Sequence, residues 1–241
     1  MEFKNKIAVI TGGASGIGRC IAEKFISAGA KVAVIDMLVA PQDINYDLYF
    51  QGDVSNEATL VKFVEQTAQK FGRVDYLINN ACLSRGGILS GCGWEDFLYV
   101  QKVGVAAPYM LTKLLLPCFN EGASIVNISS TRAFMSQAGS ESYSAAKGGI
   151  SALTHALAAS LAGRVRVNSI SPGWIDTSGG EFPGSDSEQH PAGRVGKPED
   201  IADAVMYLCG AGFITGENLI IDGGMSRLMI YHGDNGWKYE R

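Results

Sequence analysis

Three polar side chains stand at spacings that suit proton transfer. Tyr143 and Lys147 are four residues apart, and Ser130 precedes the tyrosine by 13 residues. In a helix, the four-residue spacing places the phenol and the ammonium on one face. A tyrosine phenol normally keeps its proton at neutral pH, whereas a neighbouring ammonium favours the phenolate. We interpret Tyr143 and Lys147 as a candidate pair for proton transfer, although an isolated Tyr-x-x-x-Lys pair is more often a solvated helix face.

A glycine-rich turn near the N-terminus has the composition of a phosphate site. Residues 11–18 read Thr-Gly-Gly-Ala-Ser-Gly-Ile-Gly, follow an apolar run at 6–10 and precede a segment of helical period. Glycines permit a tight turn and a close backbone approach to a pyrophosphate, and the helix N-terminus offers free N–H groups. A glycine-rich turn alone is often an ordinary tight turn. The strand before it and the helix after it favour a dinucleotide-binding site.

Asp36 indicates which dinucleotide the turn would bind. It closes the second apolar run, 18 residues after Gly18. A carboxylate at that place accepts both hydroxyls of an adenosine ribose and repels a 2′-phosphate. Met37 follows, where an arginine would favour the phosphorylated cofactor. The pattern predicts NAD rather than NADP, and the alternative is that Asp36 only caps a turn.

Short runs rich in valine and isoleucine alternate with segments of helical period. Strands are predicted at residues 6–10, 31–35, 76–78, 124–128, 165–170 and 218–221, with a weaker one at 48–51. Helices are predicted around residues 21–28, 60–71, 95–119, 142–162 and 198–209. This alternation implies crossover connections and a parallel sheet covered on both faces. The predicted fold class is α/β, with residues 1–241 forming a single domain. Residues 37–47 are expected to form a loop or one helical turn.

Composition excludes several classes of protein. A net charge of −4 with scattered lysines and arginines leaves no surface for nucleic acid. With 46% hydrophobic and 18% charged residues, the chain can bury a full core. No signal peptide and no apolar run of ~18 residues is found, so we expect a cytoplasmic protein without a membrane partner. Five scattered cysteines without a Cys-x-x-Cys pair indicate neither disulfides nor a metal site.

The glycine-rich turn together with Tyr143 and Lys147 resembles the short-chain dehydrogenase/reductase family. The resemblance continues through Asp53-Val54, Asn79-Asn80-Ala81, residues 172–177 and residues 221–224, and covers nearly the whole chain. It implies a single Rossmann-like doubly wound domain with a seven-stranded parallel sheet and helices on both faces. It also implies a homotetramer or homodimer.

The resemblance assigns roles to individual residues. Asp53 and Val54 would border the adenine, Asn80 and Ala81 the ribose side, and Ile175 and Thr177 the nicotinamide carboxamide. The full set expected to bind the cofactor is Gly12, Ser15, Gly16, Ile17, Gly18, Asp36, Asp53, Val54, Asn80, Ala81, Tyr143, Lys147, Pro172, Gly173, Ile175 and Thr177.

The implied reaction is hydride transfer between C4 of a nicotinamide and a carbinol carbon. Tyr143 would move the hydroxyl proton, Ser130 would hold the substrate oxygen, and Lys147 would bind the nicotinamide ribose. Ser129 is the weaker candidate for the serine, since it should point the other way. The hypothesis is an NAD-dependent alcohol dehydrogenase or carbonyl reductase. The alternative is a catalytically weak NAD(H)-binding regulatory or scaffold protein.

Gly104 departs from the family pattern. It stands where the family usually has an asparagine that holds a water in a proton relay to the lysine. A glycine inside a helix costs roughly 1 kcal/mol relative to alanine. A water could fill the space of the missing amide, Gln101 could supply the amide from one turn earlier, or catalysis could be impaired. An alternative register places Gln101 itself at the asparagine position.

The last third of the chain bears on substrate and assembly. Residues 178–192 correspond to the family's lid over the substrate, and their polar composition favours a small polar alcohol or ketone. His190 could act as a general acid but is expected to be solvated. Arg132 could face the pocket and bind an anionic substrate, or be a surface charge. Cys82 stands where the family has glycine and is interpreted as a small filler. The apolar residues of the tail at 225–241 are expected to pack on a neighbouring subunit.

Overall fold

A parallel sheet brings the carboxyl ends of all its strands to one edge. The computed structural model describes residues 3–229. In that range the strands are β1 (Ile7–Thr11), β2 (Lys31–Asp36), β3 (Leu48–Gln51), β4 (Val74–Asn79), β5 (Phe119–Ile128), β6 (Val165–Pro172) and β7 (Asn218–Ile221). Their order is β3-β2-β1-β4-β5-β6-β7, and every neighbouring pair is parallel. The order reverses between β1 and β4, the kind of switch point at which open parallel sheets bind ligands.

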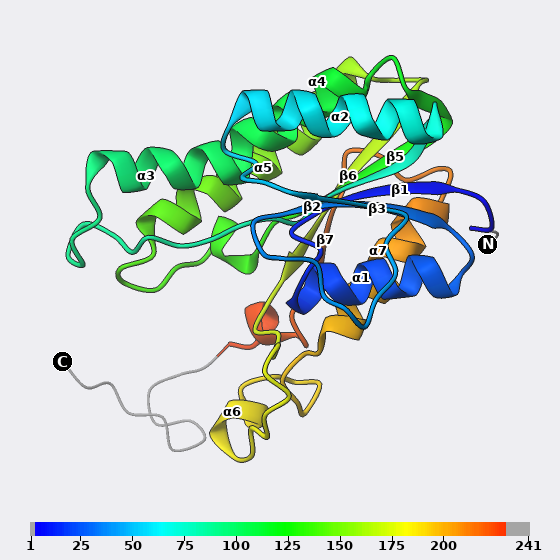
Figure 1. Ribbon diagram of the computed structural model, residues 1–241. Helices are drawn as coiled ribbons and strands as arrows, with labels where there is room; N and C mark the ends of the chain where they lie inside the picture. The colour runs from blue at the N-terminus through cyan, green and yellow to red at the C-terminus, as the bar shows by residue number, and fades with distance from the viewer. Residues whose placement is uncertain (1–2, 230–241) are drawn as a thin grey trace.

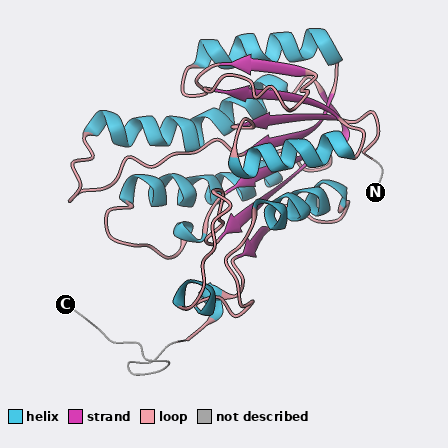
Figure 2. Cartoon of the chain, turned by 60° about the horizontal axis from the view of Figure 1, so that its bottom comes forward, coloured by secondary structure: helices cyan, strands magenta, loops and turns pink. Residues whose placement is uncertain are grey.

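Helices cover both faces of this sheet (Figure 1). The helices are α1 (Gly16–Ser27), α2 (Glu57–Phe71), α3 (Trp94–Gln101), α4 (Ala107–Leu115), α5 (Glu141–Ser160), α6 (Ser185–Glu188) and α7 (Pro198–Gly210). α1 and α7 pack side by side on one face, and α2, α4 and α5 lie on the other. Figure 2 shows the strands as a twisted stack between these two layers. The predicted single Rossmann-like domain with a seven-stranded parallel sheet is confirmed.

The core forms two apolar layers, one on each face of the sheet. Along β1, Ile7 and Val9 belong to the layer under α2 and α4, whereas Ala8 and Ile10 belong to the layer under α1 and α7. Successive side chains of a strand point to opposite faces, so a strand covered on both sides is apolar throughout. This is why the buried strands could be recognised as continuous apolar runs.

The predicted helix at residues 95–119 is shorter and interrupted. α3 ends at Gln101, a π-helical turn covers Lys102–Ala106, and α4 ends at Leu115. Pro117 has no N–H to donate to a continuing helix. Phe119 fits the helical period in the sequence, but it opens β5 and packs in the core. Residues 37–47 form a loop, as expected.

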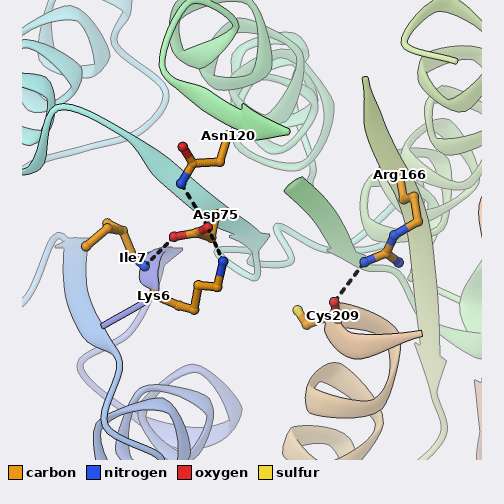
Figure 3. A network of polar contacts seen from close by, with 6 residues as sticks. All are labelled: Lys6, Ile7, Asp75, Asn120, Arg166 and Cys209. Atoms are coloured by element: carbon orange, nitrogen blue, oxygen red, sulfur yellow. Dashed lines mark hydrogen bonds and ion pairs between the residues drawn. The ribbon is translucent and has the colours of Figure 1, made fainter. Parts of the chain in front are cut away.

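The amino-terminal edge of the sheet is held by buried polar contacts (Figure 3). The carboxylate of Asp75, at the start of β4, accepts hydrogen bonds from Lys6 Nζ at 3.0 Å, Ile7 N at 2.9 Å and Asn120 Nδ2 at 2.9 Å. Arg166 of β6 donates to backbone carbonyls in the last turn of α7. These contacts join β1, β4 and β5 to one another, and β6 to α7, at the edge opposite the carboxyl ends of the strands.

Among the helices of residues 3–229, none combines the length and the apolar composition that a membrane span needs.

Leu228 and Met229 of the predicted interface tail are exposed, and the later residues of the tail lie outside the described range. Assembly through this tail therefore stays a prediction.

Candidate active site

A cavity of about 640 Å³ opens at the switch point, beside the carboxyl ends of β1 and β4. Its size lies within the usual range for ligand pockets. The structure brings most of the predicted site residues together in its wall. These are Gly12, Ser15, Ile17, Asp36, Asp53, Val54, Asn80, Ala81, Ser130, Tyr143, Lys147, Pro172, Gly173, Ile175 and Thr177. Gly16, Gly18 and Gly104 lie outside the wall.

The glycine-rich turn has the tight backbone that its composition predicted. Gly12 and Gly16 have φ values of +68° and +54°, which side chains with a Cβ rarely adopt. A Cβ on Gly18 would lie 2.0 Å from the carbonyl oxygen of Gly12. Asn80 Nδ2 donates to the carbonyl oxygens of Thr11 at 3.1 Å and Gly12 at 2.9 Å. Gly16 and Gly18 therefore act through the shape of the turn, and Asn80 fastens it.

Asp36 has the turn-capping role that the sequence left open, and its ribose-binding role stays a prediction. Its Oδ2 accepts from the N–H of Ala14 at 2.9 Å, and its Oδ1 accepts from the N–H of Leu38 at 3.0 Å. The carboxylate thus caps the turn after β2 and fastens the glycine-rich turn. It also lines the cavity. Each carboxylate oxygen can accept more than one hydrogen bond, so both retain acceptor capacity for ribose hydroxyls.

Ser130, Tyr143 and Lys147 meet where β5 faces the first turns of α5. Lys147 is buried, its Nζ donates to the carbonyl oxygen of Ile128 at 2.6 Å, and it lies 5.3 Å from the centroid of the Tyr143 ring. Ser130 Oγ accepts from the N–H of Arg132 at 3.1 Å. The ammonium is thus held close to the phenol by the end of a strand.

Ser129 also lines the first cavity, but its hydroxyl is bonded to α5. Its Oγ donates to the carbonyl oxygen of Lys147 at 2.9 Å and lies 2.7 Å from Ser151 Oγ. Both partners belong to α5, so this hydroxyl fastens β5 to the helix. Ser130 is the serine whose hydroxyl remains available at the cavity.

Sequence reasoning missed part of the wall around Asp53. Tyr99 of α3 donates its hydroxyl to Asp53 Oδ2 at 2.9 Å, and the Arg85 guanidinium lies 5.7 Å from the centroid of its ring. Burial and this hydrogen bond raise the pKa of Tyr99. Both residues line the cavity. They come from a helix and a loop far from Asp53 in the chain, and no local pattern marks such a contact.

Gly104 lies in the π-helical turn, where α5 passes very close. A Cβ on Gly104 would lie 2.8 Å from the Cβ of Ala146. The room for a Cβ at this position is thus restricted by Ala146. That a water replaces the missing amide stays a prediction. Gln101 lies one turn earlier, and its Nε2 donates to the carbonyl oxygen of Ser142 at 2.9 Å. The side-chain amide at this crossing is therefore bonded to the residue that precedes Tyr143.

A second cavity of about 560 Å³ lies on the other side of Tyr143. It shares Ser130, Tyr143, Gly173 and Ile175 with the first cavity. Groups that line both spaces can contact a cofactor on one side and a substrate on the other. The phenol and the serine hydroxyl therefore stand between two binding spaces.

The segment 178–192 is better anchored than its composition suggested. Trp174 contacts Phe182 edge-on, with ring centroids 5.1 Å apart. His190 is 2% exposed, and its Nδ1 lies 3.0 Å from the carbonyl oxygen of Asp186. The expectation of a solvated histidine is wrong, because the ring packs near Trp174. Phe182 and His190 of this segment both pack near Trp174, a contact that no local sequence pattern predicted.

The first cavity fits a nicotinamide dinucleotide. The glycine-rich turn leaves no room for a Cβ at Gly18, as a close backbone approach to a pyrophosphate requires. The N-terminus of α1 follows this turn directly. The Asp36 carboxylate suits a ribose diol at one end, and Tyr143 with Lys147 stands toward the second cavity. The wall therefore has a place for the pyrophosphate at the glycine-rich turn, for the adenosine ribose at Asp36, and for the nicotinamide end at Tyr143 and Lys147.

Comparisons with known proteins agree with this geometry. A family model described as Enoyl-(Acyl carrier protein) reductase matches residues 12–226. An uncharacterized oxidoreductase of Thermotoga maritima is 40% identical over 256 residues, which cover 95% of this chain and 99% of the relative. The structure of an apo SCOR enzyme from Clostridium thermocellum has 48% identity and a TM-score of 0.91, covering 98% of this chain and 99% of that one.

A third similar protein acts on a sugar. The ligand-free aldohexose dehydrogenase of Thermoplasma acidophilum has 29% identity and a TM-score of 0.88, covering 97% of this chain and 98% of that one. All these matches run through the glycine-rich turn, the strand with Ser130 and the helix with Tyr143 and Lys147. The chain belongs to the short-chain dehydrogenase/reductase family, whose members are oxidoreductases that bind a nicotinamide cofactor.

Proposed function

We propose that the protein is an NAD(H)-dependent oxidoreductase that interconverts a small polar secondary alcohol and its ketone. The observation that carries this proposal is the position of Ser130 and Tyr143 in the walls of both cavities. A phenol between a cofactor space and a substrate space can pass a proton while a hydride crosses between them. A cofactor-binding scaffold would have no use for that placement.

Ser130, Tyr143 and Lys147 would each have a separate role in the reaction. When bound, the nicotinamide supplies the hydride acceptor or donor. Ser130 holds the substrate oxygen, and Tyr143 takes its proton during oxidation or returns it during reduction. Lys147 places its positive charge beside the Tyr143 ring and would bind the nicotinamide ribose. Its bond to the Ile128 carbonyl fixes the ammonium for both tasks.

Asp36 supports NAD over NADP. Its carboxylate lines the cavity beside the exposed side chain of Met37, so a 2′-phosphate there would meet a negative charge and a neutral thioether. Arg85 and Lys147 are the described cationic side chains in the wall. Arg85 stacks on Tyr99, and Lys147 is bound to β5 beside Tyr143.

A polar substrate is supported by the second cavity and by one relative. Half of the residues in the wall of the second cavity are serine, threonine or glutamine. The similar protein from Thermoplasma acidophilum is an aldohexose dehydrogenase, which indicates that this architecture accepts polyhydroxy compounds. The competing hypothesis of a weakly catalytic NAD(H)-binding protein rests on Gly104.

The proposal is tested by initial rates with NAD and NADP for small polyols and sugars, and with NADH and NADPH for keto compounds. We expect turnover with a preference for NADH. Met37→Arg should raise the NADPH to NADH ratio of kcat/KM about tenfold, because it adds a cation beside the ribose. Met37→Leu is the matched control and should leave the ratio unchanged. Tight NADH binding without turnover would support the scaffold hypothesis, and a clear NADPH preference of the wild type would contradict the role of Asp36.

A further inference from the structure

The wall of the second cavity mixes polar and apolar residues and has a single charged side chain. The polar groups in its wall belong to Ser84, Ser130, Thr131, Arg132, Ser136, Gln137, Ser140, Tyr143 and Gln189. Of the described residues that line it, only Arg132 carries a full charge at neutral pH, and none is an aspartate or glutamate. A cavity with this wall favours a ligand that offers hydroxyl groups and one negative charge.

Arg132 is placed beside the catalytic serine by a short turn. The turn Thr131–Ala133 begins directly after Ser130, and the backbone N–H of Arg132 donates to Ser130 Oγ. The guanidinium of Arg132 donates from one nitrogen to Gln137 Oε1, and Gln137 also lines the cavity. A guanidinium has five N–H donors, so several remain for a ligand.

The charge of Arg132 has no acidic partner in the described part of the chain. Arg194 and Arg19 each form ion pairs with carboxylates, Asp200 and Asp43, at 2.7 Å. Arg132 is half-buried, and among the described residues its guanidinium is hydrogen-bonded to a neutral amide. A partly desolvated guanidinium gains most from a charged, bidentate acceptor. An anionic group on the substrate would supply that acceptor.

We propose that the substrate is a small hydroxy acid, or the corresponding keto acid, whose carboxylate is bound by Arg132. The proposal rests on the oxidoreductase function proposed above and narrows its substrate. The carbinol carbon would lie at Ser130 and Tyr143, and the carboxylate would lie toward Arg132 and Gln137. The two anchors would fix both ends of a short molecule and so select which hydroxyl reacts.

The reaction leaves the carboxylate unchanged. During oxidation the carbinol carbon would lose a hydride to the bound nicotinamide, its hydroxyl would lose a proton to the Tyr143 oxygen, and a C=O bond would form. The reverse direction returns both to the keto acid. Arg132 is therefore a binding residue for a spectator group. Its loss should weaken the recognition of charged substrates and spare neutral ones.

The test compares acids with matched neutral amides. Lactate, glycerate and 3-hydroxybutyrate, each paired with its primary amide, would be assayed with NAD at pH 8 by NADH formation. We expect wild-type kcat/KM to favour the acids, and Arg132→Met to lower kcat/KM for the acids by about 10- to 100-fold while leaving the amides nearly unchanged. Arg132→Lys should restore part of the preference. Arg164→Met removes a charge at the opposite end of β6 and should leave the preference intact.

A binding measurement separates this proposal from the proposed activity. Calorimetric titration of the NAD-bound protein with malonate and with the neutral malonamide needs no turnover. Binding of malonate that is lost in Arg132→Met supports the anion site even if no alcohol is oxidised. The anion site would be overturned if the wild type used acids and amides equally, or if malonate binding survived Arg132→Met. In either case, turnover of neutral alcohols would still support the oxidoreductase function.

Discussion

At the scale of single residues, Gly104 is explained by packing. The Cβ that any other residue would bring lies within 2.8 Å of Ala146. Close-packed interiors do not absorb an added methyl group without displacement, and such overpacking costs about 1–3 kcal/mol. An asparagine at this position would meet the same obstacle. Replacing Gly104 by the usual residue should therefore disturb the contact with α5 and not improve catalysis.

Paired substitutions test this explanation. Gly104→Ala should destabilise the protein, because the added methyl group meets Ala146. Ala146→Gly alone should also cost about 1 kcal/mol through lost helix propensity. The double variant should be about 1–3 kcal/mol more stable than the sum of the single effects predicts, since it removes the clash. Urea unfolding of the four proteins measures this coupling. Strictly additive losses would show that Ala146 does not restrict Gly104.

At the scale of elements, the first turn of α5 is fixed from two sides. Ser142 is fully buried, and its Oγ donates to the carbonyl oxygen of Gly86 at 2.7 Å. Its own carbonyl oxygen accepts from Gln101 Nε2 of α3. Tyr143 is the next residue, so these bonds set the position of its backbone. The loop after β4 and the end of α3 thereby orient the phenol.

Gln101 should therefore affect turnover more than cofactor binding. Gln101→Met keeps the length of the side chain and removes the hydrogen bond to Ser142. We expect kcat to fall about three- to tenfold, as the loss of one hydrogen bond would give, with little change in KM for NADH. The control is Thr67→Val on α2, which removes the bond from Thr67 Oγ1 to the Phe63 carbonyl far from the cavity. A wild-type kcat in Gln101→Met would contradict the positioning role.

Much of this arrangement could be predicted from local patterns, but its long-range contacts could not. The strands β3 and β7 have the bounds predicted for them, although the pattern at β3 was the weaker one. The end of α4 was missed because Phe119 continues the helical period into β5. The contact of Tyr99 with Asp53 and the burial of His190 depend on the tertiary fold, which a sequence window does not contain.

At the scale of the whole molecule, stability and function are separated along the strands. The buried contacts of Asp75 join strands at the amino-terminal edge, and the cavities open at the carboxyl edge.

One carboxylate at the carboxyl edge also stabilises the fold. Asp222, after β7, accepts from the N–H groups of Gly224 and Ser226, each at 2.8 Å. Burial opposes its ionisation, but the bonds from Ser226 and Gly224 outweigh burial and hold the pKa of Asp222 below its usual value.

This shift predicts how stability depends on pH. The pKa of Asp222 is lower in the folded than in the unfolded chain, so its contribution is complete above the unfolded value of about 4. It is lost as pH falls through the folded value. Asp222→Asn should lower the free energy of unfolding at pH 7 and reduce its decline between about pH 5 and pH 3. Urea unfolding across this range provides the measurement. An unchanged decline in the variant would mean that the carboxylate is not stabilised by folding.

The proposed oxidoreductase function depends on Tyr143 as the group that moves the substrate proton. Its most direct test compares wild type and Tyr143→Phe in NAD(H) turnover and in NADH binding, using the best substrate of the panel. General acid–base catalysis contributes about 10²- to 10⁴-fold, so Tyr143→Phe should lose at least 100-fold in kcat. NADH binding should change little, because the phenylalanine keeps the ring in the cavity wall. A variant that retains wild-type kcat would contradict the account.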